Sequence, residues 1–246
     1  MSDKTVTREP PIASNATSLG FSLMQTDPTP DFDLLAKAYR WLEYASFGRM
    51  LERCRLHFLP TCVTVRRALV LGDGDGRFTR RLLQSNPLVE IDAVDASVRM
   101  LQQLHQRAIA ANSGAVERVR TIQTDIRSFT PDQHGYDLVV SHFFLDCLTQ
   151  KEVDGLADRL HNSLAPNARW LISDFAIPER GWRRFAARLL IRALYFAFFL
   201  LTKLRIRQLP NYASALEENR FVRLDQKKLL GGLLITELWQ VQPPTT

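Results

Sequence analysis

The stretch Ala68-Leu69-Val70-Leu71-Gly72-Asp73-Gly74-Asp75-Gly76-Arg77-Phe78-Thr79 decides the fold of this 246-residue chain. Its four apolar residues predict a buried strand, and the residues from Arg77 onward predict a helix. Between these segments stand three glycines spaced two apart, which let the backbone turn sharply and let a ligand approach closely. Amides at a helix N-terminus that follow such a loop favour an anionic group. The stretch therefore predicts a nucleotide site.

The spacing of the glycines narrows the kind of nucleotide. The dinucleotide fingerprint requires G-x-G-x-x-G, but the residue three places after Gly74 is Arg77. The observed G-x-G-x-G, formed by Gly72, Gly74 and Gly76, resembles motif I of the class I S-adenosylmethionine (SAM) dependent methyltransferases. The resemblance extends from Ala68 to about Asp174. It implies SAM as cosubstrate and a seven-stranded sheet whose last strand is antiparallel.

Strand-like and helix-like segments alternate along the chain after its first sixty residues. Such alternation predicts right-handed crossovers and a doubly wound, Rossmann-like α/β sheet in a single domain. We expect a disordered tail over 1–30, the methyltransferase domain over 31–242, and a basic–apolar helical insertion over 183–207 after the fifth strand. Strands are expected near 68–71, 89–94, 119–124, 136–141, 170–174, 221–224 and 233–241, and helices near 31–59, 77–85, 97–112, 151–164 and 212–219.

Carboxylates stand at the ends of the next two predicted strands, where ligands bind in such sheets. Asp95 is suited to accept hydrogen bonds from both hydroxyls of a ribose, and the alternative is a helix N-cap. Asp125 can accept a hydrogen bond from the amine of adenine while Ile126 packs against the ring; the alternative is a plain surface loop. The expected cofactor contacts are Tyr39, Gly72, Asp73, Gly74, Gly76, Asp95, Ala96, Asp125, Ile126, Ser141 and His142.

Two features of the resemblance concern single residues. The segment from Tyr39 to Gly48 is similar to the one before motif I in the ubiquinone/menaquinone C-methyltransferase group, which implies that Tyr39 closes over SAM. The family usually has an acidic residue two places before the first glycine, where this chain has Val70. Asp73 and Asp75 within the loop are the two candidates for the missing charge.

The fourth and fifth predicted strands end in candidate catalytic residues. Ser141 and His142 are expected where the methyl group meets its acceptor, and His142 either takes a proton or only lines the pocket. Asp146 and Asp174 are further candidate bases. Because displacement at a sulfonium has a good leaving group, positioning dominates, and a base is needed only when the acceptor must lose a proton.

The net charge of +6 is concentrated in one segment, from Arg180 to Arg207, which surrounds the apolar run 193–201. This arrangement suits a helix at an anionic membrane surface. The alternative is a helix that caps the active site or packs in a dimer. A nucleic-acid partner is disfavoured because no strand interleaves basic and aromatic residues. We expect a small hydrophobic acceptor, because the apolar segment 189–201 follows the fifth strand, where the family that the chain resembles has acceptor-side insertions. Peripheral association with the inner face of a membrane is a further expectation.

The cysteines and histidines indicate the compartment and the metal content that we expect. Three cysteines form no paired framework and no secretory leader is recognisable, which predicts a cytoplasmic location. Five histidines show no metal-ligand spacing, so no metal is expected. One alternative function is a non-catalytic SAM-fold scaffold. A less favoured one is an aminopropyltransferase, because the segment 141–144 is apolar where the polyamine synthases have an acidic cluster.

Overall fold

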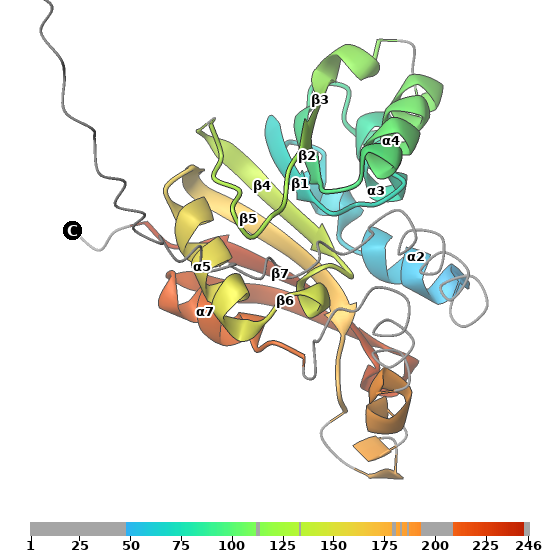
Figure 1. The fold of residues 1–246 in the computed structure, drawn as a ribbon, viewed down its shortest axis with the longest axis vertical. Coiled ribbons are helices and arrows are strands. Elements are labelled where there is room, and N and C mark those ends of the chain that lie inside the picture. Colours follow the sequence, from blue (N-terminus) through green and yellow to red (C-terminus); the bar gives the residue numbers. More distant parts are fainter. Residues whose placement is uncertain are drawn as a thin grey trace, which may run out of the picture.

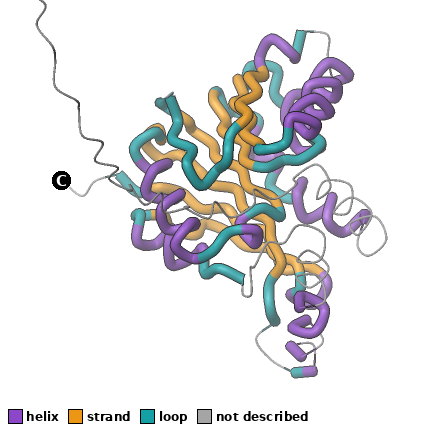
Figure 2. Tube along the Cα trace, in the orientation of Figure 1, coloured by secondary structure: helices purple, strands orange, loops and turns teal. Residues whose placement is uncertain are grey.

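The computed structural model describes residues 48–111, 114–132, 134–178, 181–182, 184–185, 187–192 and 209–243. Its centre is a seven-stranded sheet in the order β3-β2-β1-β4-β5-β7-β6, flanked by helices (Figures 1 and 2). The strands are β1 (Arg67–Leu71), β2 (Glu90–Asp95), β3 (Val119–Gln123), β4 (Tyr136–His142), β5 (Leu164–Phe175), β6 (Phe221–Leu229) and β7 (Leu234–Val241). The described α-helices are α2 (Gly48–Leu56), α3 (Arg77–Ser85), α4 (Val98–Ala111), α5 (Gln150–His161) and α7 (Tyr212–Glu218), besides the helical residues of 182–192.

The direction of the strands confirms the predicted fold class. Strands β1 to β5 are parallel, whereas β7 runs antiparallel between β5 and β6. The strand order reverses between β1 and β4, which places a topological switch point at the carboxyl end of β1. Ligands in open α/β sheets bind beyond such a point.

Alternation along each strand divides the apolar residues into two cores. Leu69 and Leu71 face the core that includes α5 and α7, whereas Ala68 and Val70 face the core of α3 and α4. Both faces of the central strands are therefore covered, and this explains why β1 is a continuous apolar run. Val70 is 1% exposed, so it belongs to the core and not to the ligand edge.

Three predicted boundaries differ from the structure. The helix predicted over 151–164 ends at His161, and β5 already begins at Leu164. Pro166 is accommodated because the pairing of β4 with β5 shifts register between Tyr136 and Leu138. Strand β6 continues to Leu229, beyond the predicted 221–224, because its partner β7 pairs with it throughout.

Several predictions fall outside the described residues. These are the tail over 1–30, the first part of the helix predicted over 31–59, the position of Tyr39, and most of the insertion over 183–207. In the ranges that the structure describes, no helix has both the length and the apolar character needed to cross a bilayer.

Candidate functional site

The glycine loop after β1 adopts a backbone that other residues rarely adopt. Gly72, Gly74 and Gly76 have φ angles of +61°, +60° and +82°. A Cβ on Gly72 would lie 2.1 Å from the ring of Phe144, and one on Gly76 would lie 2.7 Å from the Cα of Leu104 in α4. At Gly74 the nearest atom, the sulfur of Met100, is 3.9 Å away. The loop is therefore packed on both sides and open in the middle.

The two aspartates between the glycines brace the loop. Asp73 accepts hydrogen bonds from the amide of Thr79 at 2.8 Å and from its hydroxyl at 2.7 Å, so it caps the start of α3. Burial raises the pKa of Asp73. Asp75 pairs with Arg107 of α4 at 2.8 Å and with Arg77. Both carboxylates hold the loop against the helices that follow it.

Asp95 ends β2 beside the open middle of the loop. Its carboxylate accepts the amide of Ser97 at 2.8 Å and also interacts with the backbone amides of Gly74 and Ala96. Burial raises the pKa of Asp95 to about 6. Asp92, three residues earlier in β2 and therefore on the opposite face of the strand, instead bonds Arg120 at 2.8 Å and is part of the scaffold.

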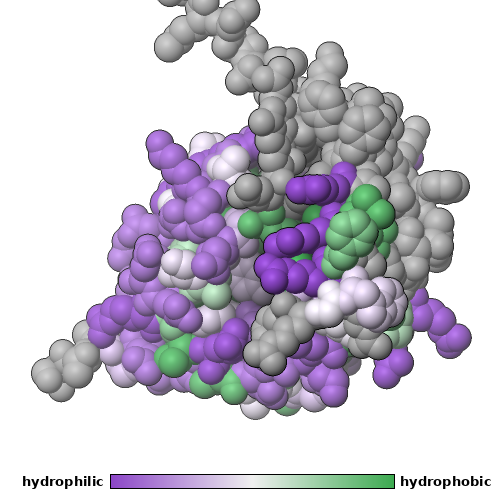
Figure 3. Space-filling model, turned by 90° about the horizontal axis from the view of Figure 1, so that it is seen from below, coloured by the Kyte–Doolittle hydropathy of each residue, from purple (hydrophilic) through white to green (hydrophobic). Residues whose placement is uncertain are grey.

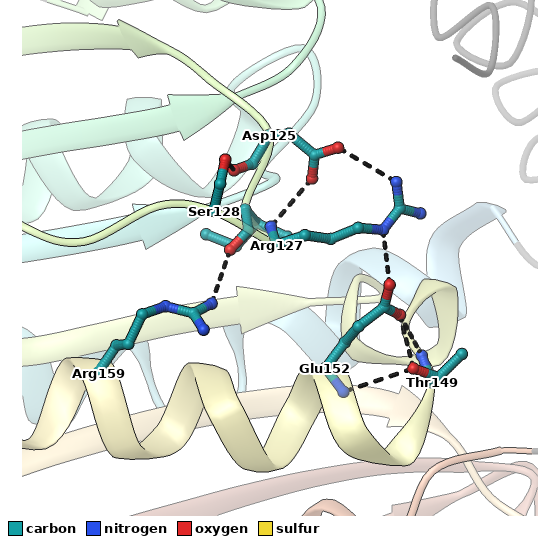
Figure 4. A network of polar contacts seen from close by, with 7 residues as sticks. Asp125, Arg127, Ser128, Thr149, Glu152 and Arg159 are labelled. Carbon is teal, nitrogen blue, oxygen red and sulfur yellow. Dashed lines mark hydrogen bonds and ion pairs between the residues drawn. The ribbon is translucent and has the colours of Figure 1, made fainter. Parts of the chain in front are cut away.

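The loop after β3 is fixed to the start of α5 by a polar network (Figure 4). Asp125 accepts the amide of Arg127 at 2.9 Å and its guanidinium at 3.1 Å. Arg127 also pairs with Glu152 at 2.8 Å, and Glu152 closes a capping box with Thr149. Ile126, which is buried, contributes its carbonyl oxygen to a hydrogen bond from Arg159 at 3.0 Å. Asp125 is thus held in one orientation by a guanidinium that the sequence analysis did not assign.

The last two residues of β4 point to opposite faces of the sheet. Ser141 accepts a hydrogen bond from the indole of Trp170 at 3.0 Å and is 1% exposed. His142 is 3% exposed and packs edge-on against Phe78, with 4.7 Å between ring centroids. Among the described residues neither ring nitrogen has a hydrogen-bond partner. Burial lowers the pKa of His142 well below its usual range, so the ring is neutral.

A strained turn follows His142 and brings β4 over the glycine loop. Phe143 has a φ of +53°, which is unusual for a bulky residue. Its amide donates to the carbonyl oxygen of Ser173, and its ring packs 5.4 Å from that of Phe175. The next residue, Phe144, occupies the space above Gly72. The strain is therefore concentrated between the glycine loop after β1 and the carboxyl ends of β4 and β5.

Two buried carboxyl groups meet at the ends of β4 and β5. Asp174 is 2% exposed and accepts the amide of Asp146 at 3.2 Å and that of Phe175 at 2.8 Å. Burial and the charge of Asp146 raise the pKa of Asp174 well above its usual range. Burial raises the pKa of Asp146 to about 6. The pair therefore holds a proton near neutral pH.

Arg55 and Tyr212 are further residues at this edge that sequence reasoning missed. Arg55 of α2 is 7% exposed, lies 5.1 Å above the ring of Phe143 and acts electrostatically on both Asp73 and His142. Tyr212 begins α7 and bonds the buried carboxylate Glu237. Arg55 follows the buried Leu51 by four residues and so lies on the buried side of α2, but this spacing does not indicate its neighbours.

In the described ranges, no group of three His, Cys, Asp or Glu side chains is arranged to hold a metal ion.

Comparison with known proteins finds similarity to methyltransferases. Residues 69–170 match the family model described as "Methyltransferase domain". A curated relative, malonyl-[acyl-carrier protein] O-methyltransferase 2 of Ilyobacter polytropus, is 30% identical over 145 residues, which are 59% of this chain and 52% of that protein. The chain thus spans about half the length of this relative.

Solved structures agree in fold. The SAM-dependent methyltransferase SibL superposes with a TM-score of 0.61 at 20% identity, covering 86% of this chain and 59% of that one. The N-methyltransferase NodS of Bradyrhizobium japonicum gives a TM-score of 0.54 at 15% identity, covering 78% of this chain and 97% of that one. At these identities the likeness establishes the fold alone.

Proposed function

Because the chain belongs to the class I SAM-dependent methyltransferases, we propose that it transfers the methyl group of SAM to a small hydrophobic acceptor. The observation that carries this proposal is the glycine loop. Its three left-handed residues are packed against Phe144 and Leu104 at the two ends but leave Gly74 open beside Asp95. This is the arrangement that a nucleoside needs: a backbone it can approach and a carboxylate for its ribose.

The residues at the strand ends fit SAM. Asp95 is proposed to bind the ribose hydroxyls, and Asp125 with Ile126 the adenine. The loop glycines and His142 are proposed to line the methionine end, where two buried ring nitrogens lack a described partner. A buried polar group without a partner is costly, and a polar ligand beside it removes that cost. Tyr39 stays a candidate lid residue from the sequence resemblance.

We propose that residues at the ends of β4 and β5 accept a proton from the methyl acceptor. SAM, when bound, supplies an electrophilic methyl group on a sulfonium. The chain supplies a carboxyl pair, Asp146 and Asp174, that keeps one proton near neutral pH and therefore has one carboxylate that can accept another. We place the base there and not on His142, because no described carboxylate bonds the imidazole and its ring packs against Phe78.

An apolar acceptor is favoured by the surroundings of this pair. Phe143, directly after β4, packs against Phe175, the last residue of β5, and the chain then continues to the apolar side chains of Trp182, Phe185 and Leu189. Carrier-protein-bound malonyl groups, for which the curated relatives are named, are charged acceptors and belong in the same assay as a comparison. The three cysteines are free thiols, which supports a reducing compartment such as the cytoplasm.

Calorimetric titration with SAM, followed by transfer of radiolabelled methyl groups to a panel of acceptors, tests this proposal. The panel contains isoprenoid quinol precursors, fatty acyl compounds and malonyl-carrier protein. We expect SAM to bind and label to enter an apolar acceptor. A folded protein that does not bind SAM would overturn the proposal. Binding without transfer to any acceptor class would instead favour the non-catalytic scaffold.

A further inference from the structure

The described residues of the segment 182–192, namely 182, 184, 185 and 187–192, are helical, and one side of this helix is anchored in the fold. Its described residues lie at the lower end of the molecule in Figure 1, after the connection that leaves β5. Ala187 and Ile191 are each 5% exposed and pack against Leu233, in a cluster that also includes Phe175. Phe175 directly follows the carboxyl group of Asp174. The buried side of the helix is therefore held next to the acceptor side of the site.

The opposite side of this helix presents large apolar side chains to the exterior. Trp182, Phe185 and Leu189 are 77%, 74% and 62% exposed. Their spacing of three and four residues places them in one stripe along the helix. Single exposed apolar residues are ordinary, but an aligned stripe of three with two aromatic rings marks a surface that binds something.

Three arginines form a second stripe beside the first. Arg184, Arg188 and Arg192 are exposed and are spaced four residues apart. At 100° per residue they lie between the buried side of the helix and the apolar stripe. In the portion of the chain that is described, no carboxylate forms an ion pair with any of them. Figure 3 views this end of the molecule and shows hydrophilic and hydrophobic side chains next to one another.

We propose that helix 182–192 docks on the surface of an anionic lipid bilayer. The apolar stripe enters the boundary between headgroups and acyl chains, and the long arginine side chains extend alongside it to the phosphates. Trp182 lies at the start of the stripe, and indole rings favour this boundary. Because the anchored side contacts Phe175, docking brings the carboxyl ends of β4 and β5 to the membrane surface.

The arrangement of charge favours lipid over a second copy of the chain. In a twofold dimer formed by this helix, the arginine stripes of two chains, each with a net charge of +6, would face each other without described counter-charges. An acidic protein would form ion pairs with the arginines, but its charge does not explain the stripe of three exposed apolar side chains. An anionic bilayer satisfies both stripes at once. This inference does not depend on the proposed methyl transfer.

Co-sedimentation with large unilamellar vesicles tests the proposal. One set of vesicles is pure phosphatidylcholine, and the other contains about one third phosphatidylglycerol, an anionic lipid. We expect the full chain to bind the anionic vesicles at least about tenfold more strongly, because each basic residue near such a surface contributes about 1 kcal/mol. Raising the salt to about 1 M, where the Debye length is about 3 Å, should weaken this preference.

Two variants and a matched control locate the binding surface. Arg184→Glu with Arg188→Glu, and separately Phe185→Ser with Leu189→Ser, should each lower vesicle binding at least about tenfold. The control carries the same charge change elsewhere, as Arg66→Glu with Lys151→Glu, two exposed residues outside this helix. Circular dichroism and thermal unfolding show whether each variant is folded.

Every outcome decides the proposal. Binding that is selective for anionic vesicles, lost in both helix variants and kept in the control supports it. Absence of binding by the parent chain overturns it, as does equal loss in the control. Concentration-dependent dimerisation that the helix variants abolish would assign the stripe to a second copy. Displacement from vesicles by acyl carrier protein, with direct binding of that protein to the parent chain alone, would assign it to an acidic protein.

Discussion

The two halves of the proposed ligand edge are built in different ways. At the ends of β1 and β2, the backbone forms the site: three glycines have left-handed φ angles, and the carboxylates of Asp73 and Asp95 accept backbone amides. At the ends of β4 and β5, side chains form it: Asp146 and Asp174 meet in the interior beside aromatic rings. The first half is suited to a ligand of fixed shape, and the second to chemistry that varies with the acceptor.

This difference has an energetic meaning. A backbone site costs strain that only glycine avoids, so substitutions there act mainly through geometry. A carboxyl pair in the interior costs desolvation, so substitutions there act through pH. Experiments should therefore separate the two halves. Added side-chain volume should affect the glycine-loop half, and a change of pH should affect the carboxyl pair.

The largest effect is expected from a methyl group added at the end of the glycine loop. Gly76→Ala combines a left-handed φ of +82° with a Cβ only 2.7 Å from the backbone of Leu104. The free energy of unfolding should fall by about 3 kcal/mol, the sum of the conformational cost and the overpacking of a helix that cannot move aside. Urea denaturation followed by circular dichroism measures it.

Gly74→Ala is the matched control for that variant. It has a similar φ of +60°, but its Cβ meets only the sulfur of Met100 at 3.9 Å. The free energy of unfolding should fall by about 1 kcal/mol from backbone conformation alone. The loss of SAM binding free energy should be larger than this loss of stability. Equal destabilisation by both variants would contradict the view that the middle of the loop is open.

A smaller effect is expected from neutralising one acid of the carboxyl pair. The pKa of Asp146 is about 6 in the fold, above the value of an unfolded aspartate. Asp146 therefore loses its proton at a lower pH in the unfolded chain than in the folded one. As the pH rises from about 4 through 6, this difference lowers the free energy of unfolding. Asp146→Asn should therefore raise the free energy of unfolding by about 2 kcal/mol at pH 8 and leave it unchanged at pH 4.

Thermal unfolding across this pH range checks the stability of Asp146→Asn. In methyl transfer, the parent enzyme should gain activity as the pH rises through about 6, and the variant should lack that rise. A stability gain that is the same at pH 4 and pH 8 would show that the effect comes from packing and not from the charge.

Much of the fold was predictable because its signals are local. The apolar run of β1, the turn after Leu71 and the alternation of helices and strands follow from sequence spacing, and the structure confirms them. The expected seven-stranded sheet with an antiparallel last strand is also confirmed. The boundary between α5 and β5 was wrong because a register shift, which depends on the neighbouring strand, accommodates Pro166.

The partners of the site residues were not predictable, because they come from distant segments. Asp125 was assigned from its strand end, yet its orientation depends on Arg127 and on Glu152 of another element. Arg55 lies on a helix before the glycine loop, and no sequence pattern links it to Phe143. Pairings of this kind depend on tertiary packing and become visible only in three dimensions.

The next smaller effect concerns Asp95, the carboxylate proposed to bind the ribose. Asp95→Ala should weaken SAM binding by more than about tenfold, or about 1.4 kcal/mol, as expected for charge-assisted hydrogen bonds. Asp92→Asn is the control, because Asp92 bonds Arg120 and Tyr136 and lies three residues before Asp95, on the opposite face of β2. It should lower stability but leave SAM affinity unchanged. Calorimetry distinguishes them, and an unaltered affinity in Asp95→Ala would remove the ribose role.

The smallest change in stability is expected at His142, which lies where the two halves meet. Its ring nitrogens have no described partner, so His142→Phe removes a desolvation cost while adding little volume, and the free energy of unfolding should change by less than about 1 kcal/mol. If His142 lines the SAM pocket, the variant loses SAM affinity but keeps the rise of activity near pH 6. Loss of that rise with unchanged SAM affinity would instead make His142 the base. The acceptor chemistry would then depend on a single buried imidazole, and the carboxyl pair would be a structural neighbour only.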